Sequence, residues 1–418
     1  MSLLSSMYTG ISGLQANGMI MGIIGDNIAN VNTIGFKGTR GNFTDVIAMS
    51  GMGTSNAANG AGTALASVQT LLGQGSLQQT EVATDLAITG AGFFVVANET
   101  GGRFYTRAGQ FKLDMDGYLV NHGGLRVQGF GIDATTGVTA SNITDLNLTS
   151  SKIPPSATTD ITIKANLNAE ALVADTFTTG TSAYDSLGVQ HQVNITFTKT
   201  AANAWSYTVE ANGEEITGGL PGDPPFLVAD GTLTFDTSGK LDTQTDNPVA
   251  FSFTGAGSQT LAMDFGDALT GVPPGTGIAG TTQFAGESTV TYQSQNGFAT
   301  GALQSVNISS DGMIVGSFSN GQLREVAVIA LANFQSLEGL KRVGGGLYTE
   351  TRASGEALIG KPTTGNRGAL QSFSLEQSNV DMAEQFVHLI SAQRGFQANS
   401  KIITTADAML GEVLNIKR

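Results

Sequence analysis

Both ends of the chain repeat apolar residues with the spacing of a helix. Near the N-terminus, residues 4–28 place an apolar residue or a glycine at alternating steps of three and four. Near the C-terminus, an apolar residue recurs at every seventh position from 382 to 410. Seams of this kind predict helices that pack together as a coiled coil. The residues expected at the core of this packing are Leu4, Ile11, Leu14, Ile28, Met382, Leu389, Phe396, Ile403 and Leu410.

The N-terminal seam is rich in glycine, with Gly10, Gly13, Gly18, Gly22 and Gly25 inside it. Each glycine costs a helix interior roughly 1 kcal/mol relative to alanine. We therefore expect this helix to fray alone and to order only when it is packed. The two helices can pair within one chain or pack between chains. Pairing within one chain would still leave one face of each helix without a partner.

The C-terminal helix is expected to begin near Asn379. Asparagine is a favoured residue at the N-cap of a helix. Asp381 and Glu384 then fall in the first turn, where negative charge suits the helix dipole. A helix that starts here contains all the apolar positions of the C-terminal seam.

The middle of the chain alternates apolar and polar residues with a period of two. Alternation with Thr and Ser on the polar side is typical of half-buried antiparallel strands. The clearest runs are residues 161–165, 193–198, 205–209, 233–235 and 249–253. The turns expected between such runs are Asp230-Gly231, Ser238-Gly239 and residues 221–223.

Strand patterns also fill residues 76–146 and 282–360, with a hairpin signal at Asp116-Gly117. The expected fold is therefore mainly β, with antiparallel sheets, a nested insertion, and N- and C-terminal α-helices that pack as a coiled coil. Its expected parts are a terminal helical domain (1–35 with 376–418), a connecting segment (36–75 with 361–375), a β-rich domain (76–146 with 282–360) and an inserted β-rich outer domain (147–281).

The distribution of charge supports the insertion as a separate domain. Residues 147–281 hold 4 basic and 14 acidic residues, a net charge of −10, whereas the rest of the chain holds 16 basic and 20 acidic residues, a net charge of −4. The total of −14 disfavours binding to nucleic acids or to anionic membranes, both of which attract basic patches. We interpret the acidic insertion as a solvated surface that limits edge-to-edge pairing of strands.

Candidate chemistry is sparse. The chain has no cysteine, its three histidines are far apart, and it lacks the phosphate-loop, HExxH and GxSxG patterns. Residues 113–117 resemble the start of a calcium loop but lack its later ligands, so we expect a β-turn there. We expect no catalytic residue, no cofactor, no metal site and no small-molecule substrate, and hence no enzyme.

The first basic residue is Lys37. A cleaved secretory signal carries basic residues before its apolar stretch. We therefore expect no cleaved signal peptide, and either a cytosolic protein or export by another route.

Short motifs at both ends and in the middle of the chain resemble those of the bacterial flagellar rod–hook family. They occur in the family's order, whereas the insertion carries no motif that we can place. The motifs are residues 12–16, 27–33, 35–37, 84–90, 92–96, 105–109, 378–381, 393–399 and 414–418. The signature residues among them are Asn27, Asn30, Gly35, Phe36, Gln393, Arg394 and Asn399.

This resemblance implies a structural polymer whose terminal helices form an inner tube. Within the family, the large insertion and residues 282–286 favour the hook branch, whose flexible curved tube joins the rod to the filament and transmits torque as a universal joint. A distal rod subunit is the alternative within the family. A secreted β-rich adhesin or binding module is the alternative from another class.

The resemblance also implies partners and a location. The implied partners are copies of the chain itself, the distal rod protein, the hook cap protein, the hook–filament junction protein and the flagellar type III export apparatus. The implied location is the extracellular flagellum, reached by export of the unfolded chain without a cleaved signal.

Overall fold

The structure is a computed structural model that describes residues 3–48, 59–133, 136–148, 152–271 and 275–416. Contacts divide the chain into two compact units. Unit 1 comprises Met1–Ser151, Gln304–Ser317 and Leu323–Arg418, and unit 2 comprises Lys152–Leu303 and Phe318–Gln322. Unit 2 is thus an insertion in unit 1, as the sequence predicts, and we describe each unit by itself.

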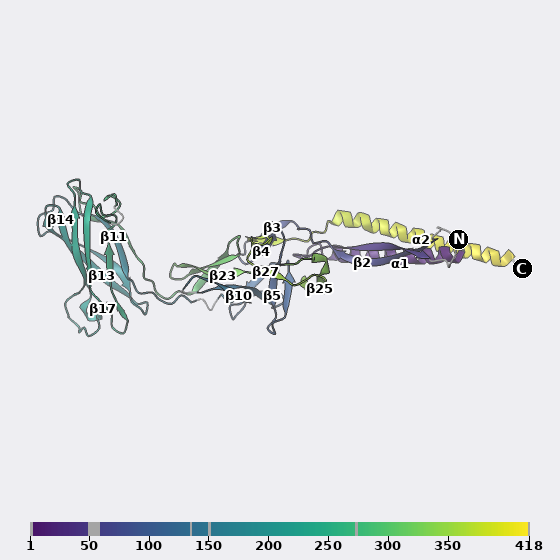
Figure 1. Ribbon diagram of the computed structural model, residues 1–418, viewed down its shortest axis with the longest axis horizontal. Helices are drawn as coiled ribbons and strands as arrows, with labels where there is room; N and C mark the ends of the chain where they lie inside the picture. The colour runs from purple at the N-terminus through teal and green to yellow at the C-terminus, as the bar shows by residue number, and fades with distance from the viewer. Residues whose placement is uncertain (1–2, 49–58, 134–135, 149–151, 272–274, 417–418) are drawn as a thin grey trace. The chain divides into compact units, whose positions relative to one another are not determined.

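The helical end of unit 1 consists of two helices and a long hairpin. Helix α1 (Leu3–Ala29) lies alongside helix α2 (Met382–Ile416) and against strands β1 (Thr39–Ala48) and β2 (Asn59–Thr70), as Figure 1 shows. The two strands pair antiparallel, from Thr39 opposite Thr70 to Ala48 opposite Asn59, with two register shifts. The expected connecting segment at residues 36–75 is therefore largely a hairpin that supports α1.

The rest of unit 1 is a β-rich body built around one large sheet. The path of that sheet is β21-β22-β23-β9-β5-β6-β26-β25, with β7, β8, β10, β24 and β27 attached. Its strands are β5 (Phe93–Ala97), β6 (Arg103–Thr106), β7 (Phe111–Leu113), β8 (Leu119–Asn121), β9 (Arg126–Ile132), β10 (Thr139–Asp145), β21 (Leu303–Ile308), β22 (Met313–Phe318), β23 (Leu323–Ile329), β24 (Leu331–Asn333), β25 (Lys341–Gly344), β26 (Leu347–Thr349) and β27 (Leu358–Gly360).

Aromatic rings fill the core of this body. Phe334 packs edge-on against Phe93 and Tyr105, with centroids 6.0 and 4.8 Å apart, and Phe93 also meets Tyr348 at 5.5 Å. Edge-to-face pairs of this kind add to the free energy gained by burial. Residues 93–96 thus form a fully buried strand.

Two short strand pairs fasten the returning chain to the body. β28 (Ala369–Ser372) pairs with β4 (Leu86–Thr89), and β29 (Ser374–Glu376) pairs with β3 (Leu77–Gln79), both antiparallel. Residues 361–375 therefore contribute to the β-rich body as well as connecting it to α2.

Unit 2 has a five-stranded antiparallel sheet packed on smaller sheets. The large sheet has the order β12 (Thr176–Tyr184), β13 (Gln190–Ala201), β14 (Ala204–Ala211), β15 (Phe226–Phe235) and β16 (Leu241–Pro248). The smaller sheets are β19 (Ala262–Asp264), β11 (Asp160–Asn166) and β20 (Thr289–Gln295), and β17 (Phe251–Ser252) with β18 (Ser258–Gln259). Among these pairs only β11 with β19 is parallel.

The period-two pattern holds along the strands of unit 2. In β14, for example, Trp205, Tyr207 and Val209 are buried and Ser206 and Thr208 face outward. The predicted strands at 161–165, 193–198, 205–209 and 233–235 are confirmed, while only Phe251 and Ser252 of the run 249–253 form a strand. The turn at Ser238-Gly239 is also confirmed, with Gly239 at φ +77°.

The turn predicted at Asp230-Gly231 is wrong, because both residues lie inside β15. A side chain at Gly231 would collide with the carbonyl of Thr245 and the ring of Tyr207. This glycine therefore allows a close approach inside the sheet, a role that turn statistics do not reveal.

The predicted end of the insertion at residue 281 also differs from the structure. Strand β20 pairs with β11 over Thr289–Gln295, so this segment belongs to unit 2 and not to the flanking body. The chain enters and leaves unit 2 as neighbours, because Ile153 exchanges backbone hydrogen bonds with Gly301, and Ser156 with Phe298. Sequence patterning does not separate two adjoining β-rich segments, since both alternate with the same period.

A polar cluster fixes the turn between β12 and β13. Asp185 accepts hydrogen bonds from the backbone N–H groups of Leu187 (2.9 Å) and Val189 (2.8 Å), and it lies 3.3 Å from His191 Nε2. His191 in turn stacks on Phe253 and places Nδ1 2.5 Å from Glu215. Burial works to raise the pKa of Asp185, but these hydrogen bonds outweigh it and lower the pKa.

We predict that Asp185→Asn destabilises unit 2 at neutral pH by about 1–2 kcal/mol, because it weakens hydrogen bonds to a charged acceptor. A carboxylate with a lowered pKa in the folded state stabilises above its ordinary pKa and loses this effect as the pH falls. The difference from the unchanged protein should therefore shrink in acid. Urea unfolding at several pH values, followed by fluorescence of the single tryptophan, Trp205, measures it.

The exposed Asp267 of unit 2 provides the control. Asp267→Asn should leave the unfolding midpoint unchanged at every pH. An Asp185→Asn variant that is as stable as the unchanged protein at neutral pH would contradict the assignment.

Candidate assembly interface

The helices α1 and α2 run antiparallel, and small or polar residues meet where they are closest. A Cβ atom built on Gly13 would lie 2.6 Å from Asn399 Nδ2, and one on Gly395 would lie 2.8 Å from Asn17 Oδ1. Farther along, Asn27 Nδ2 donates to Gln385 Oε1 at 3.1 Å. The glycines thus let the two backbones approach closely, and asparagines fill the remaining space.

The contact face of α1 falls one position before the predicted seam. Gly10 faces Ile403, and Ile24 and Asn27 are buried, whereas the seam runs through Ile11, Gly25 and Ile28. The predicted residues that are half-buried in one chain are Leu14, Ile28, Leu389, Ile403 and Leu410. Ile11, Met382 and Phe396 are exposed by 39%, 43% and 41%, and only the backbone of Leu4, in α1, is described. That these nine residues form the assembly core stays a prediction.

A single chain leaves many large apolar side chains of the helices in water. Met382, Phe386 and Ile390 follow one another at steps of four along α2 and so share a face. Other exposed apolar residues of the two helices are Tyr8, Met19, Val387, Ile402 and Met409. Exposed apolar patches of this kind mark surfaces that bind other proteins.

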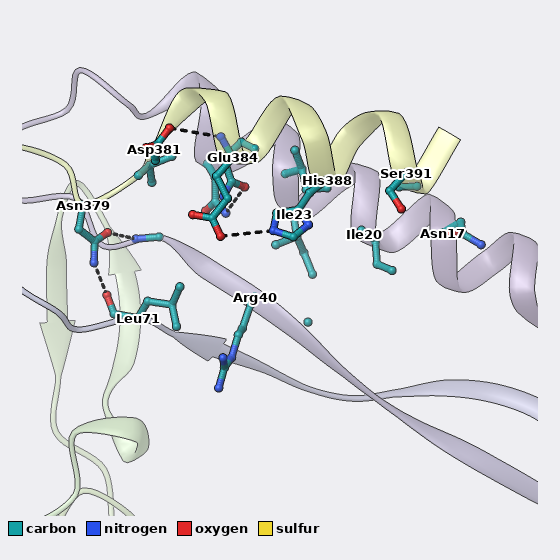
Figure 2. A pocket seen from close by; sticks show the side chains of 17 residues that line it. Asn17, Ile20, Ile23, Arg40, Leu71, Asn379, Asp381, Glu384, His388 and Ser391 are labelled. Carbon is teal, nitrogen blue, oxygen red and sulfur yellow. Dashed lines mark hydrogen bonds and ion pairs between the residues drawn. The ribbon is translucent and has the colours of Figure 1, made fainter. Parts of the chain in front are cut away.

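A cavity of about 510 Å³ opens where the two helices meet the base of the β1–β2 hairpin. Figure 2 shows residues that line it from three elements: Ile20 and Ile23 of α1, Glu384 and His388 of α2, and Arg40 of β1. His388 Nε2 lies 3.4 Å from Glu384 Oε1. The lining of this cavity therefore combines apolar and charged side chains.

The cap of α2 differs from the prediction. Asp381 Oδ1 accepts hydrogen bonds from the backbone N–H groups of Ala383 (2.8 Å) and Glu384 (3.2 Å), so Asp381 and not Asn379 is the N-cap. Asn379 instead joins separate segments: its Oδ1 accepts from Gly38 N (2.8 Å) and its Nδ2 donates to the carbonyl of Leu71 (2.7 Å). The prediction was wrong because asparagine is equally able to bridge two loops.

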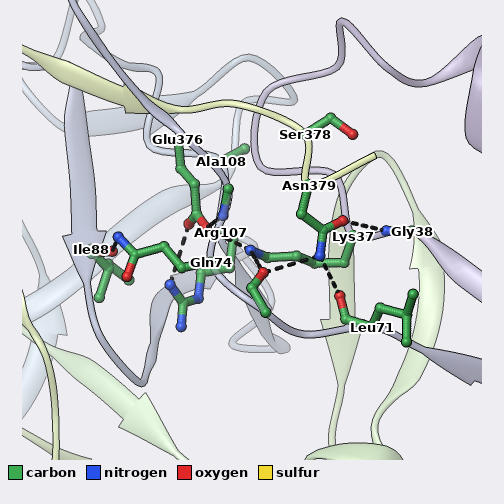
Figure 3. Close-up of polar contacts among 12 residues, drawn as sticks. Lys37, Gly38, Leu71, Gln74, Ile88, Arg107, Ala108, Glu376, Ser378 and Asn379 are labelled. Atoms are coloured by element: carbon green, nitrogen blue, oxygen red, sulfur yellow. Dashed lines mark hydrogen bonds and ion pairs between the residues drawn. The ribbon is translucent and has the colours of Figure 1, made fainter. Parts of the chain in front are cut away.

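Beside this bridge lies a buried cluster of three charges (Figure 3). Lys37 Nζ donates to Glu376 Oε1 at 2.5 Å, and Arg107 Nη1 donates to Glu376 Oε2 at 3.2 Å. The side chains of Lys37 and Glu376 are fully buried and that of Arg107 nearly so. Burial lowers the pKa of Lys37 and of Arg107, since it disfavours their charged forms, while Glu376 opposes the effect.

Sequence reasoning missed this cluster. Lys37 and Arg107 lie in motifs quoted above, yet nothing in those motifs indicated burial or a common partner 269 residues or more away. A lysine between Phe36 and Gly38 in an apolar, glycine-rich stretch is the only signal that could have drawn attention to it.

Comparisons with known proteins match all parts of the chain. Four family models match: Flagella basal body rod protein (residues 7–37), Flagellar hook protein FlgE/F/G D1 domain (87–169), Flagellar basal body protein FlaE D2 domain (147–298) and Flagellar basal body rod FlgEFG protein C-terminal (371–416). The chain is 35% identical to the flagellar hook protein FlgE of Borreliella burgdorferi, over 99% of this chain and all of that protein.

The chain belongs to the flagellar hook protein family. It is also 34% identical to flagellar hook protein FlgE of Treponema pallidum, over the whole of both chains, and 32% identical to that of Salmonella typhimurium, over 99% of this chain and 100% of the relative. A crystal structure of Helicobacter pylori flagellar hook protein FlgE2 covers 72% of this chain with a TM-score of 0.50 at 16% identity, which supports the fold alone.

The residues predicted as the family's signature have different surroundings in this chain. Asn27 Nδ2 donates to the carbonyl of Thr39 at 2.8 Å, and Asn27 Oδ1 accepts from Thr39 N at 2.9 Å. Asn30 Oδ1 accepts from Thr33 Oγ1 at 3.1 Å. Gly35 has φ +68°, and a Cβ atom there would lie 2.6 Å from Ala108 N. These contacts turn the chain from α1 into the hairpin.

The remaining predicted signature residues range from buried to exposed. Phe36 is buried beneath the guanidinium of Arg342, 5.1 Å away, and Asn399 packs on Gly13. Gln393 and Arg394 are exposed on α2. These two side chains are thus available to a neighbour outside the chain.

Neither a membrane helix nor a metal cluster is found in the described part of the chain. None of its helices combines the length and the hydropathy that a membrane span requires. No group of three or more His, Asp or Glu side chains is arranged to hold a metal ion there. The backbone N–H of Gly117 donates to the carbonyl of Asp114 at 3.2 Å, which is the hydrogen bond of the predicted β-turn within residues 113–117.

We predict that Gly13→Leu separates α1 from α2, because the new side chain collides with Asn399. The expected cost is about 1–3 kcal/mol, the usual range for overpacking. It should appear as a lower urea midpoint for the helical signal in far-ultraviolet circular dichroism. Gly18 has open space around its Cα and provides a matched control. Gly18→Leu should be neutral or stabilise α1 by up to ~1 kcal/mol, and equal effects of the two changes would contradict the close-packed interface.

Proposed function

We propose that this chain is a structural subunit of the bacterial flagellar hook, which polymerises with copies of itself into a curved tube that joins the rod to the filament. The observation that carries the proposal is full-length similarity to flagellar hook proteins in a chain whose terminal helices leave Met382, Phe386 and Ile390 in water. Burial of such side chains between subunits stabilises a polymer by roughly 25 cal/mol per Å² of apolar surface removed from water.

The insertion favours a hook subunit over the alternative, a distal rod subunit. Unit 2 is a complete domain with its own aromatic core, and residues 147–298 match the flagellar D2 model. The relatives named above are hook proteins and match the chain from end to end. The adhesin alternative has no comparable support.

The surface of unit 2 suits a joint that bends while it rotates. In a bent rotating tube every row of subunits lengthens and shortens once per turn, so outer surfaces must slide with low barriers. The outward face of the five-stranded sheet carries threonine pairs such as Thr178 with Thr196 (3.1 Å) and Thr232 with Thr245 (2.9 Å). Neutral hydroxyls exchange partners more easily than ion pairs, because water replaces each weak bond as it breaks.

The proposed role is mechanical and not catalytic. By analogy with the family, the partners are the distal rod protein, the hook cap protein, the hook–filament junction protein and the type III export apparatus. The same analogy gives the extracellular flagellum as the location and export of the unfolded chain without a cleaved signal as the route.

We predict that Phe396→Asp prevents tube formation by purified protein, because it places a charge on an exposed apolar position of α2. Electron microscopy under assembly conditions measures the outcome. Leu172→Asp, at an exposed position of unit 2, is the control and should assemble normally.

The same experiment separates the alternatives. Curved tubes of the unchanged protein support the hook, and straight rods support the distal rod. Normal tubes from Phe396→Asp would contradict the predicted assembly core.

A separate deletion of both helices tests the adhesin alternative. If the protein keeps its function in the cell without the helices, the adhesin is favoured.

A further inference from the structure

The buried charge cluster joins four segments that are far apart in the sequence. Glu376 Oε1 accepts from Lys37 Nζ and from Gly75 N (2.9 Å), and Glu376 Oε2 accepts from Arg107 Nη1. The backbone carbonyl of Glu376 also accepts from Gly35 N at 2.7 Å. One residue of the returning chain therefore holds the exit of α1, the end of the β1–β2 hairpin and the body of unit 1.

Glu376 supplies the negative charge that faces both cations of this cluster, whose three side chains together carry a net charge of +1. Lys37 and Arg107 bring two buried cations. Lys37 also donates to the carbonyl of Gly73 and Arg107 to that of Gly90, each at 2.8 Å, and the Arg107 guanidinium lies over the ring of Phe93 at 5.3 Å, but none of these partners carries a negative charge. A buried charge without a counter-charge is far less stable than the same charge in water. The observed positions of Lys37 and Arg107 are thus unfavourable until a carboxylate lies between them.

We propose that Glu376 is a charge latch, which closes the base of unit 1 only when the C-terminal segment has arrived. Before that, Lys37 and Arg107 stay hydrated and residues 35–38 and 71–75 remain open. Three neighbouring contacts depend on the same segment: Gly38 N with Asn379 Oδ1, β29 with β3, and β28 with β4. The inference concerns the folding of a single chain and does not rest on the proposed assembly.

The latch orders the folding of the chain. Unit 2 has its own core and holds no part of the cluster, so it can fold before residue 376 is available. A chain whose N-terminus emerges first therefore completes the junction between α1 and the body last. A subunit whose residues 369–379 have not yet docked has no closed base, so α1 and α2 are not yet attached to the hairpin beside it.

Hydrogen exchange of the full-length chain tests the latch. In Glu376→Gln, which keeps the shape of the side chain and removes its charge, exchange at residues 35–38, 71–75 and 369–379 should rise together by about a hundredfold or more. Unit 2 should be unchanged. Glu81→Gln, at an exposed glutamate of unit 1, is the matched control and should stay within about twofold. A rise confined to the immediate neighbours of residue 376, or no rise, overturns the proposal.

A second substitution distinguishes charge from packing. Adding Lys37→Met to Glu376→Gln removes one of the two uncompensated cations, so it should restore at least about tenfold of the lost protection. If Glu376 acted only through its shape and hydrogen bonds, removing Lys37 as well would increase exchange further. A further rise, or no restoration, overturns the latch, and restoration remains measurable even if Glu376→Gln alone leaves unit 1 open.

Discussion

The structure of unit 1 depends on the burial of two cations around one carboxylate. The chain leaves α1 at Asn30, builds the hairpin and the body, and comes back to the same place at Glu376. Because isolated charges are unstable away from water, Lys37, Arg107 and Glu376 fix the crossing of the outgoing and returning segments. The directions of α1 and α2 are set from this point, since Asn27 and Asn379 attach the two helices to the hairpin immediately beside it.

The helix pair shows how a family of self-assembling subunits can combine a close contact between two helices with an exposed apolar surface. Between α1 and α2, glycine and asparagine let the backbones approach closely and bury little apolar surface. The large apolar side chains are then left for other contacts, as at Phe386 and Ile390. A conventional pair with leucine at each meeting point would use those side chains within one subunit.

Much of the fold could be predicted from the sequence, and the parts that could not share a physical cause. Period-two alternation identified the strands around Ile163, Ile195 and Tyr207, because local patterning reports which face of a strand is buried. Local patterning could not predict where the insertion ends, that Gly231 lies inside a strand, or that the contact face of α1 runs through Gly13. Each of these depends on a residue distant in sequence, such as Thr245 for Gly231 and Asn399 for Gly13. The charge cluster could not be predicted for the same reason. The residues expected at the assembly core remain a prediction, because their expected partner is a neighbouring subunit, which a single chain does not contain.

The way the chain passes through unit 2 has a consequence for how such proteins diversify. Ile153 and Gly301 are bonded neighbours at the two ends of the insertion, so a domain of any size whose ends lie equally close can replace unit 2 without rerouting the remaining chain. The site is therefore a natural position for exchanging whole domains, in evolution or by grafting. Variation in unit 2 is separated from the part of the sequence that builds the helices and their junction.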